Sequence, residues 1–279
     1  MKYKKYISNA IRFIILLVIS FIFFIPFLWT FLCSIKTDAE IYSAHMSILP
    51  SVITGIHFTK VFTQMGDFMA YSRNSIIVSF VSVALVVIFS TTMGYSFSKL
   101  KFYGKSIFLA IVLLVLTIPY VIYLVPIYIM ESRANLLDSC LGLILPYVAV
   151  NLPFGVFIMQ AQFNGIPKEL PEAAKIDGCN QWSTFYKIMV PVVKPGIATV
   201  IIYIFIIVWG EFTYARTLTV TTRSLTLPVG ITFLRDEAAS WQYGTLCATI
   251  VLSLIPTLAI FLSMQKYLVK GIMEGAVKG

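Results

Sequence analysis

The sequence predicts an all-α membrane protein with six transmembrane helices. Hydrophobic residues make up 59% of its 279 residues and charged residues only 12%, whereas an ordinary soluble domain carries about 25% charged residues. Long apolar runs recur along the chain, at residues 13–35, 74–98, 106–130, 139–163, 195–215 and 242–265. At a rise of about 1.5 Å per residue, each run is long enough to cross a hydrocarbon core of about 30 Å.

One membrane domain, residues 13–268, is therefore expected between an N-terminal tail (1–12) and a C-terminal tail (269–279). The first apolar run lacks a small-residue cleavage site and is expected to remain as a helix. Prolines within the runs predict kinks. The four cysteines form no C-x-x-C pair, so neither a metal nor another cofactor is predicted.

The basic residues predict the orientation of the chain. Net charge is +9, and in a membrane protein an excess of lysine and arginine marks the cytoplasmic side instead of a nucleic-acid partner. One set of alternate segments carries roughly twice as many lysines and arginines as the other. We therefore expect a multi-pass protein of a prokaryotic cytoplasmic membrane, without nucleic acid, whose cytoplasmic segments are 1–12, 99–105, 164–194 and the C-terminal tail.

The polar stretch "NGIPKELPEAAKIDGCNQWSTFYKIMVPVVKPG" interrupts this apolar chain at residues 164–196. Pro171 favours the start of a short helix, with acidic residues near its positive end. Gly178 stands where a left-handed turn would end that helix. A second short helix is expected over Trp182–Met189, and Pro191 is expected to help end it. The stretch thus predicts two short helices joined by a glycine elbow at the cytoplasmic face.

Two functions fit this elbow equally well on the residues alone. The alanines allow the first helix to sit deeply in a cleft of another protein, and the Glu172 carboxylate can accept two hydrogen bonds from an arginine there. Alternatively, the elbow is an amphipathic connection whose lysines rest on anionic lipid headgroups.

The spacing within this stretch resembles the EAA loop of ABC importer permeases. "PEAAKIDG" is followed by nine residues and then "IMVP"; Val190 replaces the leucine usual in the family. The resemblance implies an ATPase-coupling role for Glu172, Ala173, Ala174, Asp177, Gly178, Ile188 and Pro191.

The resemblance extends along most of the chain and is specific to carbohydrate importers, to the permease of the maltose-transporter G-subunit type. The matching stretches are "IPFLWTFLCSIK", "RNSIIVS", "IPKELPEAAKIDG", "WGEFTYA", "LTLPVG" and "QKYLVKGIMEGAVKG". An asparagine is commoner in the family at the position of Gly210, which weakens the transfer of a substrate contact to this residue.

Membership of this family implies the type I ABC importer permease fold and a transported sugar or oligosaccharide. It implies a homologous second permease, a dimer of cytoplasmic ATPases that performs the hydrolysis, and an extracytoplasmic sugar-binding protein. The permease itself is then no enzyme. The elbow would sit in an ATPase cleft, and the tail residues Gly275 and Lys278 would reach the ATPases.

Glu211 is the only charged residue within the six apolar runs. A carboxylate at that depth is a candidate functional group, and with Trp209 and Phe212 it would form a sugar path. It would otherwise pair with Arg216 or cap backbone groups. His45 and His57 show no metal-ligand spacing and are expected to be solvated.

Three other classes of protein compete with this interpretation. A membrane-embedded enzyme lacks a Ser/His/Asp set, an H-E-x-x-H motif and a P-loop. An ion-coupled secondary carrier would usually bring paired intramembrane charges. An ABC permease for a non-sugar solute remains open.

Overall fold

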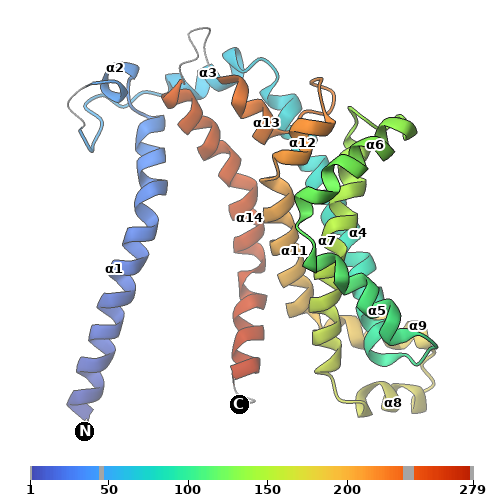
Figure 1. Cartoon of the computed structure of the whole chain (residues 1–279). Coiled ribbons are helices and arrows are strands. Elements are labelled where there is room, and N and C mark those ends of the chain that lie inside the picture. Colours follow the sequence, from blue (N-terminus) through green and yellow to red (C-terminus); the bar gives the residue numbers. More distant parts are fainter. Residues whose placement is uncertain (1, 44–46, 235–241, 277–279) are drawn as a thin grey trace. The chain divides into compact units, whose positions relative to one another are not determined.

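The computed structural model describes residues 2–43, 47–234 and 242–276, and across these residues it contains helices and loops but no strand. Five helices are long (Figure 1): α1 Lys2–Ser34, α4 Phe68–Lys99, α7 Cys140–Asn164, α11 Lys194–Trp209 and α14 Tyr243–Ala276. The shorter helices are α2 Asp38–Ile41, α3 Ile56–Gln64, α5 Lys105–Leu114, η1 Val115–Thr117, η2 Tyr120–Tyr123, α6 Leu124–Ala134, α8 Glu169–Ile176, α9 Gln181–Ser183, η3 Thr184–Met189, α10 Val190–Val192, α12 Thr213–Leu218, α13 Leu227–Ile231 and η4 Thr232–Leu234.

The helices confirm an all-α membrane protein. Within the described residues, α1, α4, α7 and α14 are each long and apolar enough to cross a bilayer. The described residues also contain two bent pairs of helices, 105–117 with 120–134, bent by 98°, and 181–192 with 194–209, bent by 73°; if each pair forms one span, the candidate spans number six. The third predicted span is therefore broken, and the fifth has a sharply turned entrance.

The chain packs as two compact units. One unit comprises residues 1–68 and 231–255, and the other comprises residues 69–230 and 256–279. The second unit contains both regions that the sequence singles out. One is the segment 164–194 with its two short helices, called the elbow from here on, and the other is the surroundings of Glu211.

In the second unit, α4, α7 and α11 lie next to one another (Figure 1), and small residues bring them into close contact. A Cβ added at Gly94 would lie 2.7 Å from the Cβ of Met159, and one at Gly155 would lie 2.8 Å from the Cβ of Ser90. Gly196 of α11 approaches the side chain of Gln162 even more closely. Membrane helices associate through such small residues, because these let the backbones approach. The three helices therefore form a tightly packed frame.

The third span breaks at Ile118 and Pro119. Ile118 is extended, with φ −100° and ψ 126°, and Pro119 has no amide hydrogen to continue the helical ladder. By contrast, α7 continues as one helix through Pro146 and Pro153. Among these three prolines, only Pro119 stands at a break.

One predicted boundary was wrong. The fifth span was expected to reach Ala215, but α11 ends at Trp209 and the separate helix α12 begins at Thr213, because Gly210 ends α11 and the backbone turns. The last predicted span, residues 242–265, agrees with the candidate span Tyr243–Tyr267, and the helix α14 continues beyond it to Ala276.

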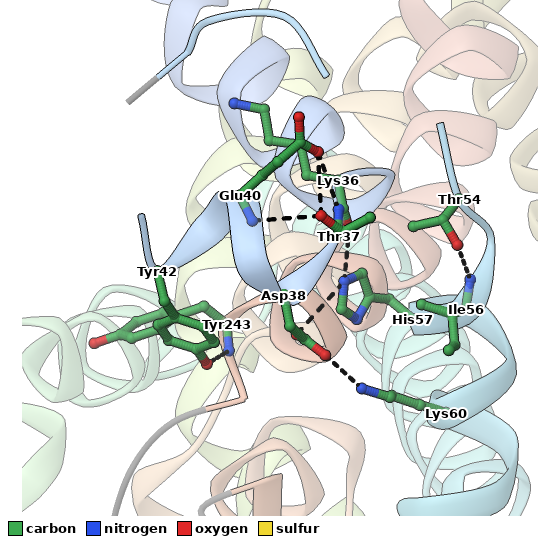
Figure 2. Close-up of polar contacts among 10 residues, drawn as sticks. All are labelled: Lys36, Thr37, Asp38, Glu40, Tyr42, Thr54, Ile56, His57, Lys60 and Tyr243. Carbon is green, nitrogen blue, oxygen red and sulfur yellow. Dashed lines mark hydrogen bonds and ion pairs between the residues drawn. The ribbon is translucent and has the colours of Figure 1, made fainter. Parts of the chain in front are cut away.

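A polar network holds the segment after α1 in the first unit (Figure 2). Nε2 of His57 lies 2.8 Å from the carbonyl oxygen of Lys36, and Lys60 forms an ion pair of 2.7 Å with Asp38. His57 was expected to be solvated, but its exposed fraction is 0%. The reason is its contact with Gly244, where any Cβ would collide with the imidazole ring. His45 lies outside the described residues.

The same network includes a reciprocal cap at the start of α2. Thr37 accepts a hydrogen bond from the Glu40 amide, and the Glu40 carboxylate accepts one from the Thr37 amide. Hydrogen bonds from Ser51, together with those from Thr37, lower the pKa of Glu40 to about 2. The carboxylate is therefore ionised at neutral pH and fixes the turn that follows α1.

Candidate functional site

The turn that follows α8, within the elbow, has the geometry that the sequence predicts. Gly178 has a left-handed φ of +80°, which glycine adopts without a steric penalty. Its amide donates to the carbonyl of Lys175 over 3.1 Å, and the amide of Cys179 donates to the carbonyl of Ala174 over 2.9 Å. These two bonds form a Schellman motif and satisfy carbonyls at the end of the helix.

The second helix of the elbow is less regular than predicted. Asn180 caps its start by accepting a hydrogen bond of 2.8 Å from the amide of Ser183. The turns then widen into the π-helix η3 before α10 begins. Pro191 was expected to end the helix but lies inside α10. The widened turn makes room for its ring, which would otherwise meet a carbonyl of the preceding α-helical turn.

An aromatic cluster ties the elbow to the membrane helices. Phe185 of η3 lies 4.9 Å from Tyr95 of α4, and Tyr95 lies 5.5 Å from Phe163 of α7, between ring centroids. All three side chains are buried. In addition, Lys99 donates to the carbonyl of Ile166 over 2.6 Å. The aromatic cluster and this hydrogen bond therefore fasten the elbow to α4 and α7.

The other side of the elbow is open. Glu172 is exposed, and its carboxylate has no hydrogen bond or ion pair with any residue that the structure describes. Large apolar side chains are exposed on the elbow, with exposed fractions of 87% for Ile176, one turn after Glu172 in α8, and 67% for Trp182 of α9. An exposed apolar surface next to an unpaired acid is typical of a protein-binding site.

The remaining EAA-type residues divide between the two sides. Ala174 is buried, at 2% exposure, where α8 packs on η3, while Ala173 is exposed. Asp177 is exposed at the end of α8, Pro191 is exposed and Ile188 is half-buried. The first alanine is thus available to a partner, and the second lets the two short helices pack closely.

Glu211 is held by this chain's own groups. Its carboxylate accepts a hydrogen bond of 2.6 Å from the hydroxyl of Tyr147 and hydrogen bonds from the backbone amides of Tyr214, at 2.9 Å, and Ala215, at 3.1 Å. It therefore caps the start of α12. Across the described residues, no ion pair joins Glu211 to Arg216. Sequence reasoning missed Tyr147, because nothing in the local pattern links positions so far apart.

A cavity of about 560 Å³ adjoins Glu211. Its walls come from the broken third span (115–123), from α7, from α11 and from residues 210–214. Phe212 lines this cavity, whereas Trp209 does not and stacks on Phe205 with centroids 5.5 Å apart. The cavity also includes side chains that the sequence did not single out: Tyr120, Tyr123, Asn151, Phe154 and Tyr203.

Residues 87–274 match the family described as "Binding-protein-dependent transport system inner membrane component". The chain belongs to this family of transporter permeases. The permease is 36% identical to a putative ABC transporter permease protein, ORF2, of a Caldicellulosiruptor strain, over 96% of each chain. It is 31% identical to the arabinooligosaccharides transport system permease protein AraQ of Halalkalibacterium halodurans, over 94% of this chain and 93% of that one.

A third relative is the trehalose transport system permease protein SugB of Mycobacterium tuberculosis, 31% identical over 91% of the permease and 92% of that protein. Among solved structures, the permease resembles a chain of a bacterial ABC transporter that imports the acidic polysaccharide alginate. The TM-score is 0.79 at 23% identity, covering 94% of the permease and 96% of that chain. The permease therefore has the type I ABC importer permease fold.

Proposed function

We propose that this permease is a subunit of an ATP-driven importer that carries a sugar or oligosaccharide across the cytoplasmic membrane. The observation that carries the proposal is the elbow, whose open side presents an unpaired carboxylate and whose inner side is fastened to α4 and α7. Sugar as the transported solute is supported by the arabinooligosaccharide and trehalose systems to which two relatives belong.

The proposed assembly contains a homologous second permease, a dimer of ABC ATPases and an extracytoplasmic sugar-binding protein. It is supported by a second alginate transporter structure, solved in complex with a pentasaccharide-bound periplasmic protein. In this assembly the permease is non-catalytic, and the ATPases hydrolyse ATP.

We further propose that both termini and the elbow lie in the cytoplasm, as the distribution of lysine and arginine favours. The elbow then enters an ATPase cleft, where Glu172 pairs with a basic residue and Ala173 contacts the wall. Gly178 sets the angle, and closure of the ATPases moves α4 and α7 through the aromatic cluster. Gly275 lies in α14 and Lys278 lies outside the described residues; both are proposed to reach the ATPases.

Transport in membrane vesicles tests the proposed function. Sugar uptake by the complete importer is expected to require ATP and the ATPase subunits. Uptake that persists without ATP and collapses with the ion gradient would instead identify a secondary carrier.

A charge reversal tests the docking role of the elbow. Glu172→Lys is expected to abolish copurification of the ATPases, because removing one partner of a buried charge pair costs about 2–5 kcal/mol. Glu169→Lys is the matched control, since it makes the same change in the same helix at another exposed position. Wild-type copurification and uptake for Glu172→Lys would refute docking and favour a loop that rests on lipid.

A further inference from the structure

Two cysteines lie side by side where α1 ends and α14 begins. The thiol groups of Cys33 and Cys247 form a side-chain hydrogen bond. Cys33 stands in the last turn of α1, and Cys247 opens the second turn of α14. Both belong to the first compact unit. The fold therefore brings together two thiols that are separated by most of the sequence.

Other contacts hold the same two helix ends together (Figure 2). The ring of His57 lies 2.8 Å, at Nε2, from the carbonyl oxygen of Lys36, and it meets Gly244 so closely that no Cβ fits there. The amide of Tyr243 donates to the hydroxyl of Tyr42 over 3.3 Å, and the centroids of these two rings are 6.1 Å apart. The closeness of the cysteines thus follows from contacts that do not involve sulfur.

The directions of the two helices place both cysteines at one depth. Cys33 lies about one turn before Lys36, whose amide donates to its carbonyl over 3.4 Å, and Cys247 lies about one turn after Gly244. Because α1 runs toward the His57 contact and α14 runs away from it, these two turns lead in the same direction. Both thiols therefore lie about one turn deeper in the membrane than His57.

The pair is near an oxidising compartment in the proposed orientation. With both termini in the cytoplasm, the end of α1 and the start of α14 face outward. Disulfides form and persist outside the cytoplasm, whereas cytoplasmic thiols are kept reduced. Cys33 is 7% exposed, and Cys247 is more exposed, so an oxidant reaches Cys247 first.

We propose that Cys33 and Cys247 are a modification site, at which a disulfide links α1 to α14 at the outer face of the membrane. The oxidant is the disulfide of an extracytoplasmic thiol–disulfide oxidoreductase. The inference goes beyond the proposed function and rests on the proposed orientation.

The reaction is two successive thiol–disulfide exchanges. The Cys247 thiol loses its proton and attacks one sulfur of the oxidant, whose S–S bond breaks and whose other sulfur leaves and takes up a proton. The Cys33 thiol then loses its proton and attacks Sγ of Cys247. The second sulfur of the oxidant leaves and takes up that proton. The permease has lost two electrons and two protons, and the oxidant has become a dithiol.

The disulfide would fasten a helix that is otherwise weakly held. The most apolar window of α1 has 0% of its residues buried within this chain, so the contacts at its outer end carry most of its attachment. A cross-link between Cys33 and Cys247 closes a loop that contains most of the chain, and longer loops restrict the unfolded state more strongly.

Counting free thiols tests the proposal. Aerobically grown cells that produce the complete importer are quenched in acid, which stops thiol exchange. The permease is then tagged in SDS with a maleimide–polyethylene glycol, so that each free thiol shifts the gel band. The chain has four cysteines, and the wild type is expected to carry two tags without prior reduction and four after it.

Single substitutions identify the pair. Cys33→Ser and Cys247→Ser are each expected to carry three tags with or without reduction. Cys140→Ser is the matched control, because Cys140 also stands at the end of a membrane helix; it is expected to carry one tag without reduction and three after it. Copurified ATPase confirms that each variant is assembled.

Heating the purified complex tests the fastening. Reduction is expected to lower the unfolding midpoint of the wild-type permease by more than about 2 °C and to leave that of Cys33→Ser unchanged. Four tags on the unreduced wild type, a disulfide that survives in Cys33→Ser, or equal midpoints before and after reduction would overturn the proposal. Maleimide labelling of Cys179 in intact cells would instead overturn the orientation on which it rests.

Discussion

Replacing Gly178 by alanine isolates the backbone geometry of the elbow. No atom lies within 4 Å of a Cβ built at this position, so the substitution causes no collision. What remains is the left-handed φ of +80°, which costs an L-residue about 1–2 kcal/mol. That amount changes a conformational equilibrium about 5–30-fold. If the elbow must hold this angle to dock, the affinity of the permease for its ATPases should fall by a similar factor.

The assay is a titration of detergent-solubilised permease with ATPase, combined with sugar uptake in vesicles. Gly178→Asn should weaken binding less than Gly178→Ala, because asparagine tolerates the left-handed region. Gly178→Val should weaken it more, because a β-branched residue is a genuine outlier there. Gly165→Ala is the control: this glycine has an ordinary φ of −68° and its nearest neighbour would lie 3.5 Å from the new Cβ. Equal binding by all four variants would refute the reasoning.

Four further predictions concern other parts of the chain. A membrane-impermeant maleimide should label Cys179 only after vesicles are opened; labelling in intact cells would reverse the orientation. Phe185→Ala should leave ATPase binding intact but reduce uptake per ATP hydrolysed, because a buried ring worth about 3–5 kcal/mol no longer links the elbow to α4 and α7; unchanged coupling would exclude the aromatic cluster from transmission. Deleting residues 275–279 should preserve insertion and lower transport-coupled hydrolysis, and full transport would make the tail dispensable. Asp138→Asn should speed tryptic cleavage after Arg223, since the Asp138 carboxylate accepts hydrogen bonds from the backbone and hydroxyls of residues 220–224; an unchanged cleavage rate would show that other contacts hold that loop.

The elbow was predictable because its determinants are local. A glycine directly after a short helix specifies a left-handed turn whatever surrounds it, and the structure has that turn at Gly178. The π-helix after it was not predictable, because it depends on how Phe185 packs against two distant helices. The prolines show the same limit of prediction from local sequence. Pro119 stands at a break, while Pro153 lies inside an unbroken helix, and the neighbouring residues do not reveal which proline breaks its helix.

The surroundings of Glu211 were predictable only in part. The sequence singled out this region because Glu211 is an intramembrane carboxylate. The hydroxyl that donates a hydrogen bond to this carboxylate belongs to Tyr147, which comes from another helix. The cavity is likewise formed by three separate segments of the sequence that meet only in the folded chain. His57 is buried for a comparable reason, since its contact with Gly244 joins distant parts of the sequence.

The interruption at Ile118 and Pro119 bears on how a cell must produce this protein. A continuous helix carries its own backbone hydrogen bonds into lipid, so it is tolerated there alone. A broken one brings polar peptide groups to membrane depth, and each group left unsatisfied in hydrocarbon costs several kcal/mol. In this chain the hydroxyl of Tyr214 satisfies the carbonyl of Tyr120, which lies 94 residues earlier in the sequence. The broken span therefore gains this hydrogen bond only after the later helix α12 has been synthesised and has packed against it.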